Sequence, residues 1–212
     1  MATIPAHLAQ FAADGSWTNM TIGDYARRWA ETDPERQVYL GDPTAPTYAS
    51  LLADGEALAR ALHDLGLRTG DVIGFQVPNW VEASVINLAA NLGGFVIAPI
   101  VPIYRDAEVI QMLGDCGAKA YFVAESFRGY DFAAMMAGLR AALPELQDVV
   151  TVRDTGELTW ETAIGRDAAL ESALPKVDPS AVMMVMYTSG TTGKPKGVLH
   201  THYSYDHRAR AM

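Results

Sequence analysis

The chain has 212 residues, of which 50% are hydrophobic and 19% are charged, so it can bury a sizeable core in one large domain or two small ones. Its net charge of -9 argues against a general nucleic-acid-binding protein, because such binding depends on neutralising phosphates with basic side chains. The single cysteine allows no intrachain disulfide, and the N-terminus lacks the basic-then-apolar pattern of a secretory signal, so we expect a cytoplasmic protein.

Apolar residues at helical and strand periods alternate along the chain. Residues 1–20 are expected to be irregular, Thr21 and Thr47 are predicted to cap the first two helices, and Gly66 and Gly117 follow predicted helix ends. The predicted helices cover residues 22–32, 48–65, 80–92, 106–116, 132–143 and about 159–164, with a last one from Thr201 or His202. The predicted strands cover residues 36–41, 72–77, 95–100, 118–124, 148–152, 181–187 and 198–200.

This alternation predicts an α/β fold. Several of the strands are apolar throughout, which indicates an open, mostly parallel sheet with helices on both faces. Ligands of such sheets bind outside the carboxyl ends of the strands.

One stretch could instead cross a membrane. Ala83 to Tyr104 contains no charged residue and is long enough to span a bilayer. It also contains Asn87, Asn91, the pair Gly93-Gly94 and two prolines. We interpret it as a helix, a Gly-Gly break and a buried strand, with a transmembrane helix as the alternative.

The stretch with the densest functional chemistry follows the apolar run 181–187. Residues 187–197 read Tyr-Thr-Ser-Gly-Thr-Thr-Gly-Lys-Pro-Lys-Gly. Glycines let the backbone approach a ligand closely, successive N–H groups form a concave anion site, and hydroxyls and lysines add donors and charge. This composition predicts a site for a chain of phosphates, and the alternative is a flexible surface loop.

The loop fails the test for a P-loop that binds nucleotide with Mg²⁺. That pattern ends in Gly-Lys followed by Ser or Thr and opens with a glycine five residues before the Gly-Lys pair. Here Pro195 follows Lys194, and Thr188 stands where the opening glycine should be. Pro195 also opposes a helix starting directly after Lys194.

Other reactive side chains give weaker signals. Cys116 lies in an Asp-Cys-Gly-Ala turn without a nearby basic residue, so we do not expect a catalytic thiol. His200, His202 and His207 lack the further ligands that a metal site needs, and we expect His202 at the N-terminus of a helix near the active site.

The loop resembles the signature of the AMP-dependent synthetase and ligase family, the adenylate-forming enzymes. The stretch Thr47-Tyr48-Ala49-Ser50-Leu51, the stretch from Leu65 to Asp71, and Pro78-Asn79-Trp80 also follow that family's pattern. The resemblance covers roughly residues 20–212. Within the family the chain is most similar to acyl-CoA synthetases, and residues 127–132 are similar to a stretch of cyclohexanecarboxylate-type CoA ligases.

The resemblance implies a reaction in two halves: ATP activates a carboxylic acid as an acyl-adenylate, and coenzyme A then displaces AMP, with Mg²⁺ as the metal. It implies that the loop holds the β- and γ-phosphates of ATP, with Lys194 facing solvent. The implied hydroxyl donors are Thr188, Ser189, Thr191 and Thr192, the implied backbone donors are Gly190 and Gly193, and Lys196 supplies charge.

The resemblance also implies that the chain is incomplete. Members of the family continue past this loop with segments that bind adenine, ribose and Mg²⁺ and that supply a catalytic lysine. Residues 1–212 are therefore expected to be a partial N-terminal AMP-binding domain, truncated just after the phosphate-binding loop, with the main catalytic residues beyond Met212 and no activity without the missing C-terminal half. The alternatives are a non-catalytic ATP- or pyrophosphate-binding module and an interaction half that complements a separate C-terminal half.

Overall fold

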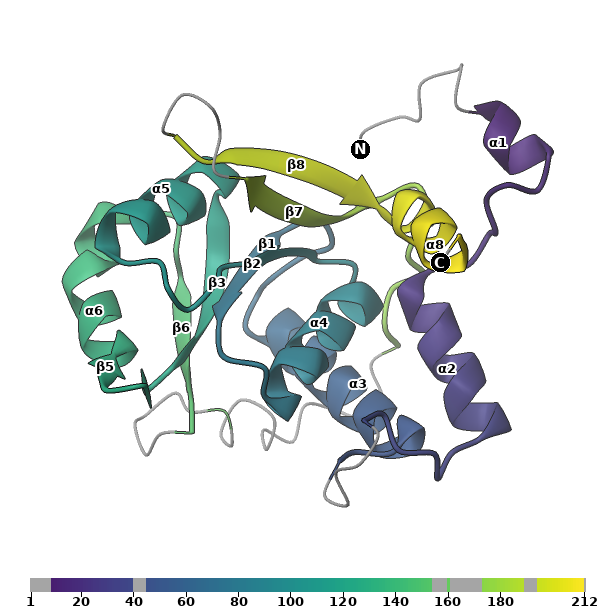
Figure 1. Cartoon of the computed structure of the whole chain (residues 1–212), viewed down its shortest axis with the longest axis horizontal. Coiled ribbons are helices and arrows are strands. Elements are labelled where there is room, and N and C mark those ends of the chain that lie inside the picture. Colours follow the sequence, from purple (N-terminus) through teal and green to yellow (C-terminus); the bar gives the residue numbers. More distant parts are fainter. Residues whose placement is uncertain (1–8, 40–44, 154–159, 161–172, 189–193, 212) are drawn as a thin grey trace.

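The computed structural model describes residues 9–39, 45–153, 160, 173–188 and 194–211 (Figure 1). Six strands form one sheet in the order β6-β3-β1-β2-β7-β8. The neighbours from β6 to β7 pair in parallel, and only β7 and β8 pair antiparallel. The prediction of an open, mostly parallel sheet is confirmed. The strands are β1 (Val72–Gln76), β2 (Val96–Pro99), β3 (Ala118–Ala124), β6 (Asp148–Val152), β7 (Val182–Thr188) and β8 (Lys196–Thr201).

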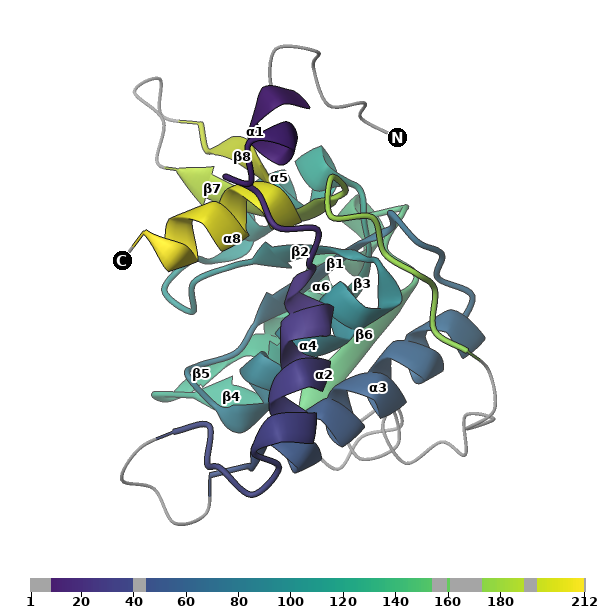
Figure 2. The same ribbon diagram turned by 90° about the vertical axis from the view of Figure 1, so that its right-hand side faces the viewer.

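Helices cover both faces of this sheet, as predicted. On one face α4 packs against β1 and β2, and α2 and α3 pack on α4 as an outer layer (Figures 1 and 2). On the other face α5 and α6 lie against the sheet. The helices are α1 (Ala9–Ala13), α2 (Ile22–Thr32), α3 (Tyr48–Asp64), α4 (Val81–Gly93), α5 (Asp106–Cys116), α6 (Phe132–Leu139) and α8 (His202–Arg210).

Glycines allow the helices to pack closely on the sheet and on one another. A Cβ on Gly74 of β1 would meet Leu113 of α5 at 2.9 Å. A Cβ on Gly55 of α3 would lie 2.9 Å from Leu88 of α4. The layers therefore enclose one large core, which includes Phe75, Ile97, Phe122 and many aliphatic side chains around them.

Local signals place most of the helix ends. The hydroxyl of Thr21 accepts a hydrogen bond from the N–H of Asp24 at 3.1 Å, and the Asp24 carboxylate accepts one from the N–H of Thr21 at 2.8 Å. Thr47 and Ser50 make the same reciprocal pair at the start of α3. These capping boxes confirm both predicted N-caps.

The uncharged stretch from Ala83 to Tyr104 folds as interpreted. Helix α4 ends at Gly93, Gly94 takes the left-handed conformation with φ of 73°, and β2 follows at Val96. In the described part of the chain, no helix is long and apolar enough to cross a membrane. The transmembrane alternative for this stretch is wrong, because the break at Gly94 sends the chain into the sheet.

Four local predictions need correction. Residues 9–13 form a helix where we expected irregular chain. In the predicted strand 36–41, the described residues make only an isolated β-bridge, from Gln37 to Thr47. The helix predicted to reach Leu143 ends at Leu139 with a short 3-10 turn, since Pro144 restricts the residue before it. A small hairpin of β4 (Ser126–Phe127) and β5 (Tyr130–Asp131) was not predicted, because its strands are too short to show a period.

Candidate functional site

The phosphate-loop sequence lies at the tip of an antiparallel hairpin. β7 leads into it and β8 leads out, and the two strands pair from Val182 with Thr201 to Thr188 with Lys196. The strand predicted at residues 198–200 is confirmed as part of β8, which begins earlier than expected, directly after Pro195. Since β7 runs parallel to β2, the loop follows the carboxyl end of a strand in the parallel part of the sheet, where ligands of such sheets bind.

Two of the predicted site residues face each other across this hairpin. Thr188 and Lys196 are paired residues, and the Thr188 hydroxyl donates to the Lys196 carbonyl at 3.5 Å. Both residues are exposed, so a hydroxyl and an ammonium group are accessible on either side of the loop. Lys194 is exposed too, as expected. The other predicted site residues, Ser189, Gly190, Thr191, Thr192 and Gly193, lie outside the described residues.

Tyr187 anchors this end of β7 to the neighbouring helix. Its hydroxyl donates to the Asp115 carboxylate at 2.8 Å and lies 3.0 Å from the Met112 carbonyl, both on α5. Its side chain packs against the small buried cluster of Val96, Ala98 and Val185. Burial and the hydrogen bond to Asp115 raise the pKa of the Tyr187 phenol far above its usual value, so the hydroxyl stays protonated. The base of the loop is thus fixed to the sheet and to α5.

A glycine allows the two strands to meet at this point. Gly197 pairs with Tyr187, and a Cβ on Gly197 would lie 2.9 Å from Cγ2 of Val185. Real Cβ atoms do not approach other atoms that closely, so a larger residue would push β8 away from β7. The last glycine of the motif therefore has a packing role in the hairpin.

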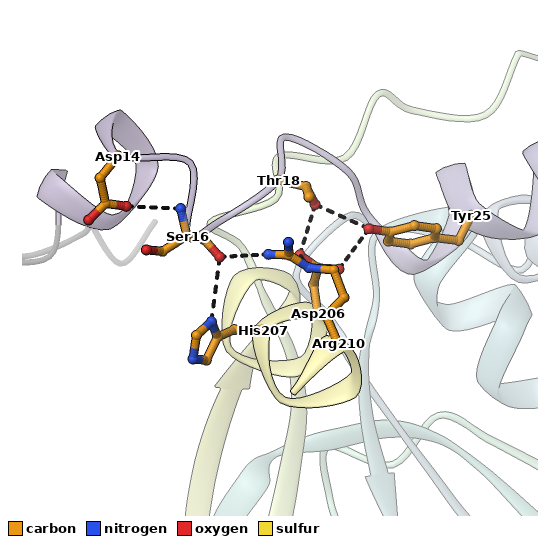
Figure 3. A network of polar contacts seen from close by, with 7 residues as sticks. All are labelled: Asp14, Ser16, Thr18, Tyr25, Asp206, His207 and Arg210. Atoms are coloured by element: carbon orange, nitrogen blue, oxygen red, sulfur yellow. Dashed lines mark hydrogen bonds and ion pairs between the residues drawn. The ribbon is translucent and has the colours of Figure 1, made fainter. Parts of the chain in front are cut away.

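The helix after the hairpin is held by a polar network with the N-terminal segment (Figure 3). Asp206 on α8 is only 2% exposed, and its carboxylate accepts from the Tyr25 hydroxyl at 2.7 Å and from the Thr18 hydroxyl at 2.8 Å. Arg210 pairs with the same carboxylate at 3.2 Å and donates to the Ser16 carbonyl at 2.6 Å. Segments at opposite ends of the chain are joined here.

The network determines the ionisation state of the Asp206 carboxylate. Burial alone would raise the pKa of Asp206, but the hydrogen bonds from Tyr25 and Thr18, together with the Arg210 guanidinium, outweigh it and hold that pKa below its ordinary value. The carboxylate is therefore ionised at neutral pH.

Aromatic packing extends the contact between α8 and the N-terminal segment, since Trp17 stacks on Tyr203 with ring centroids 4.7 Å apart.

His202 opens α8, as expected, but its side chain is buried against α2. Its Nδ1 accepts from the N–H of Ile22 at 3.4 Å, and the residue is 2% exposed. Burial lowers the pKa of His202 to about 4, so the imidazole is neutral at pH 7. This side chain contributes to the contact between α8 and α2.

No metal site or reactive thiol is found among the described residues. In that part of the chain, no three histidine, cysteine or acidic side chains are grouped so that they could hold a metal ion. Burial raises the pKa of the Cys116 thiol, which disfavours the reactive thiolate. The hairpin tip is therefore the strongest candidate site.

Sequence reasoning missed the network around Asp206. Thr18 and Asp206 are separated by 188 positions, so no local spacing connects them. The only signal was the presence of many aromatic and polar residues near both ends, including Trp17, Tyr25 and Tyr203, and that composition does not identify partners.

Comparisons with known proteins agree with this architecture. Residues 26–212 match a protein family described as AMP-binding enzyme. The chain is 32% identical over 199 residues to a medium-chain fatty-acid–CoA ligase of Escherichia coli K12, an alignment that covers 92% of this chain and 35% of that protein. It is 30% identical over 212 residues to a salicyl-AMP ligase/salicyl-S-ArCP synthetase of Mycobacterium tuberculosis H37Rv, covering 96% of this chain and 37% of that protein.

A solved structure shows the same fold. The apo structure of MbtA from Mycobacterium smegmatis matches with a TM-score of 0.85 and 28% identity, covering 100% of this chain and 39% of that one. The chain thus spans little more than a third of the length of the relatives that it matches.

Proposed function

The chain belongs to the AMP-binding enzyme family, and on that premise we propose that it is the N-terminal part of an acyl-CoA synthetase. In the proposed reaction, an oxygen of a carboxylic acid attacks the α-phosphorus of ATP, and the bond to the β-phosphate breaks to release pyrophosphate. The thiolate of coenzyme A then attacks the acyl carbon, and AMP leaves. Activation is needed because a free carboxylate is a poor electrophile.

The observation that carries the proposal is the exposed pair Thr188 and Lys196 on either side of the signature loop. A hydroxyl and an ammonium group are donors that suit phosphate oxygens. We assign Thr188 to bind the β- or γ-phosphate and Lys196 to stabilise the charge that develops on the departing pyrophosphate. Ser189, Gly190, Thr191, Thr192 and Gly193 complete the proposed phosphate site.

Mg²⁺ would accompany ATP and neutralise its phosphates. The described residues contain no cluster of acidic or histidine side chains for it, so we assign no protein ligand to the ion. The ligand residues would lie in the part of the enzyme that follows this chain.

From the free energies of hydrogen bonding and of association, we expect the 212 residues to bind ATP weakly and not to catalyse the reaction. A hydrogen bond to a charged group contributes about 1.5–3 kcal/mol, whereas association costs on the order of 4–15 kcal/mol. Three or four such bonds exceed the cost of association by little, so the net free energy of ATP binding would be small. The residues that would hold adenosine, acid and thiol are expected in the remaining two thirds of the enzyme.

The relatives differ in the thiol that accepts the acyl group. One relative is named as a CoA ligase and another as a synthetase that loads a carrier protein, here ArCP. We propose coenzyme A as the acceptor of the acyl group. On the resemblance of residues 127–132, we propose a carboxylic acid related to cyclohexanecarboxylate as the first substrate to test.

An assay of pyrophosphate release tests the proposal. The 212-residue chain would be incubated with Mg-ATP, coenzyme A and a panel of aliphatic, alicyclic and aromatic acids. We expect no turnover by the chain alone, and acid-dependent release when the chain is extended to the full length of its relatives. Robust turnover by the 212 residues would refute the proposed need for the missing part. A full-length enzyme that releases no pyrophosphate with any acid would refute the ligase assignment.

An interaction half is the second candidate function, and one observation favours it. The edge strand β8 and its neighbour expose apolar side chains on one face, because Met186, which is 44% exposed, pairs with Val198, which is 43% exposed. Exposed apolar surface of this kind marks an interface. Co-expression with a separate C-terminal half should then restore acid-dependent pyrophosphate release. Isothermal titration with ATP and with pyrophosphate separates both proposals from a non-catalytic binding module, which would bind tightly without any partner.

A further inference from the structure

Tyr187 connects the strand that leads into the signature loop with the C-terminal end of α5, which lies beside the loop end of the hairpin (Figure 1). Its hydroxyl donates to the Asp115 carboxylate at 2.8 Å and lies 3.0 Å from the Met112 carbonyl. A hydrogen bond to a charged acceptor is roughly twice as strong as a neutral one. This bond therefore fixes the Tyr187 side chain against α5.

The same tyrosine contacts the backbone that carries both proposed phosphate donors. Thr188 follows it directly in β7. Across the hairpin its ring covers Gly197, since a Cβ on that glycine would lie 3.4 Å from Cε1 and 3.5 Å from Cζ of the ring. Lys196 precedes Gly197 and pairs with Thr188. One anchored ring thus holds the chain on both sides of the loop, one residue away from each donor.

The Asp115 carboxylate lies on the other side of the hairpin from the Thr188 hydroxyl. Successive side chains of a strand point to opposite faces. Val185 and Tyr187, two positions apart in β7, share the face that packs against the small buried cluster and contacts α5. The Thr188 side chain therefore points to the opposite face. An effect of Asp115 on a phosphate held by Thr188 has to pass through the backbone.

Helix stability does not explain the position of Asp115. The residue is exposed and lies in the last turn of α5. The C-terminus of a helix carries a partial negative charge, so a carboxylate there is unfavourable. A carboxylate near a site for phosphates is also unfavourable, because like charges repel. The hydrogen bond from Tyr187 supplies a reason for an acid at this place.

We propose that Asp115 is a positioning residue of the phosphate site, which acts through the Tyr187 hydroxyl to hold Thr188 and Lys196 in place before the ligand binds. The inference rests on the proposed function of the loop. An anchored backbone has less freedom to lose when phosphates bind, and preorganisation of this kind raises affinity. Without the anchor, the same donors would bind the same phosphates more weakly.

Variants of the ¹⁵N-labelled chain, titrated with Mg-pyrophosphate, separate positioning from charge. Tyr187→Phe removes the hydroxyl but keeps the ring and the net charge. We expect it to bind roughly threefold to tenfold more weakly than the wild-type chain, because one more side chain has to be ordered on binding. Asp115→Ala should weaken binding similarly, although it removes a negative charge. Asp115→Asn keeps an acceptor oxygen for Tyr187, so its affinity should equal or exceed that of the wild-type chain.

Tyr130→Phe is the matched control. Tyr130 donates to Asp106 at the other end of α5, with 3.5 Å between the two oxygens, and this variant should bind Mg-pyrophosphate as the wild-type chain does. A second measurement needs no ligand. Backbone ¹⁵N order parameters of Thr188 and Lys196 should fall in Tyr187→Phe and stay unchanged in Tyr130→Phe.

The results for the loop and for Asp115 can be told apart. If the wild-type chain shows no saturable shifts at the hairpin, the proposed function of the loop is wrong and this inference is wrong with it. If the wild-type chain binds and Tyr187→Phe binds equally tightly with unchanged order parameters, only the positioning role is refuted. Tighter binding by Asp115→Ala than by the wild-type chain would also refute it, since Asp115 would then act by repulsion alone.

Discussion

At the scale of single residues, the hairpin depends on a glycine whose role is steric. Gly197 sits where any Cβ would lie 2.9 Å from Val185. We predict that Gly197→Ala destabilises the chain by about 1–3 kcal/mol, as overpacking does in a tight contact. Urea denaturation would measure the loss.

A second glycine provides the matched control for this substitution. Gly138 is exposed on α6, and a Cβ there would meet nothing within 4 Å. Gly138→Ala should raise stability by roughly 0.5–1 kcal/mol, because alanine has less backbone freedom to lose in a helix. Equal effects at the two positions would contradict the steric role of Gly197.

The buried His202 predicts a pH dependence of stability. Its pKa is about 4 in the folded chain, against an ordinary value of 6.5, so the unfolded chain takes up a proton that the folded chain excludes. The stabilisation is present above pH 6.5 and is lost as the pH falls towards 4, by up to about 3 kcal/mol. Denaturation of the chain at pH 7, 6, 5 and 4.5 would show the decline.

Variants can assign that decline to one side chain. His202→Gln should flatten the stability curve between pH 6.5 and 4, while His207→Gln removes an exposed imidazole from the same helix as a control. An unchanged slope in His202→Gln would mean that other groups cause the acid sensitivity.

At the scale of elements, α8 is connected to the N-terminal segment by the Asp206 network. We predict that Tyr25→Phe and Asp206→Ala are coupled by about 1–2 kcal/mol in a double-mutant cycle, because both remove one hydrogen bond at 2.7 Å. Urea denaturation of the two single variants and the double variant would measure this coupling.

The control cycle pairs Tyr25→Phe with Gly138→Ala on the far face of the sheet. Those two changes should be additive within roughly 0.5 kcal/mol. Additivity of Tyr25→Phe with Asp206→Ala as well would show that the network does not hold α8 in solution.

The sequence predicted elements where a local signal was strong. Threonine caps placed the starts of α2 and α3, and the pair Gly93-Gly94 placed the end of α4. It failed where structure depends on distant partners or on very short strands: residues 36–41 and the β4–β5 hairpin show no lasting period. The Gly197 contact and the Tyr187 anchor were also unpredicted, since both depend on the register of β7 with β8 and on α5.

At the scale of the whole molecule, the parallel sheet places the signature loop at the carboxyl end of β7, and the chain covers little more than a third of its relatives' length. The alternation of helices and strands was sufficient to predict the sheet and its two covered faces. The proposed role of the loop came from its composition and from the family resemblance, because hydroxyls, glycines and lysines predict a phosphate ligand without specifying the reaction.

We propose that the hairpin tip binds the phosphates of ATP, with Lys196 as the charged group. Titration of the ¹⁵N-labelled chain with Mg-pyrophosphate tests it most directly, using Lys196→Ala and the neighbouring Lys194→Ala, which change the net charge equally. We predict weak, saturable shifts at Thr188 and Lys196 that are lost in Lys196→Ala and kept in Lys194→Ala. Shifts that avoid the hairpin, or equal losses in the two variants, would contradict the account.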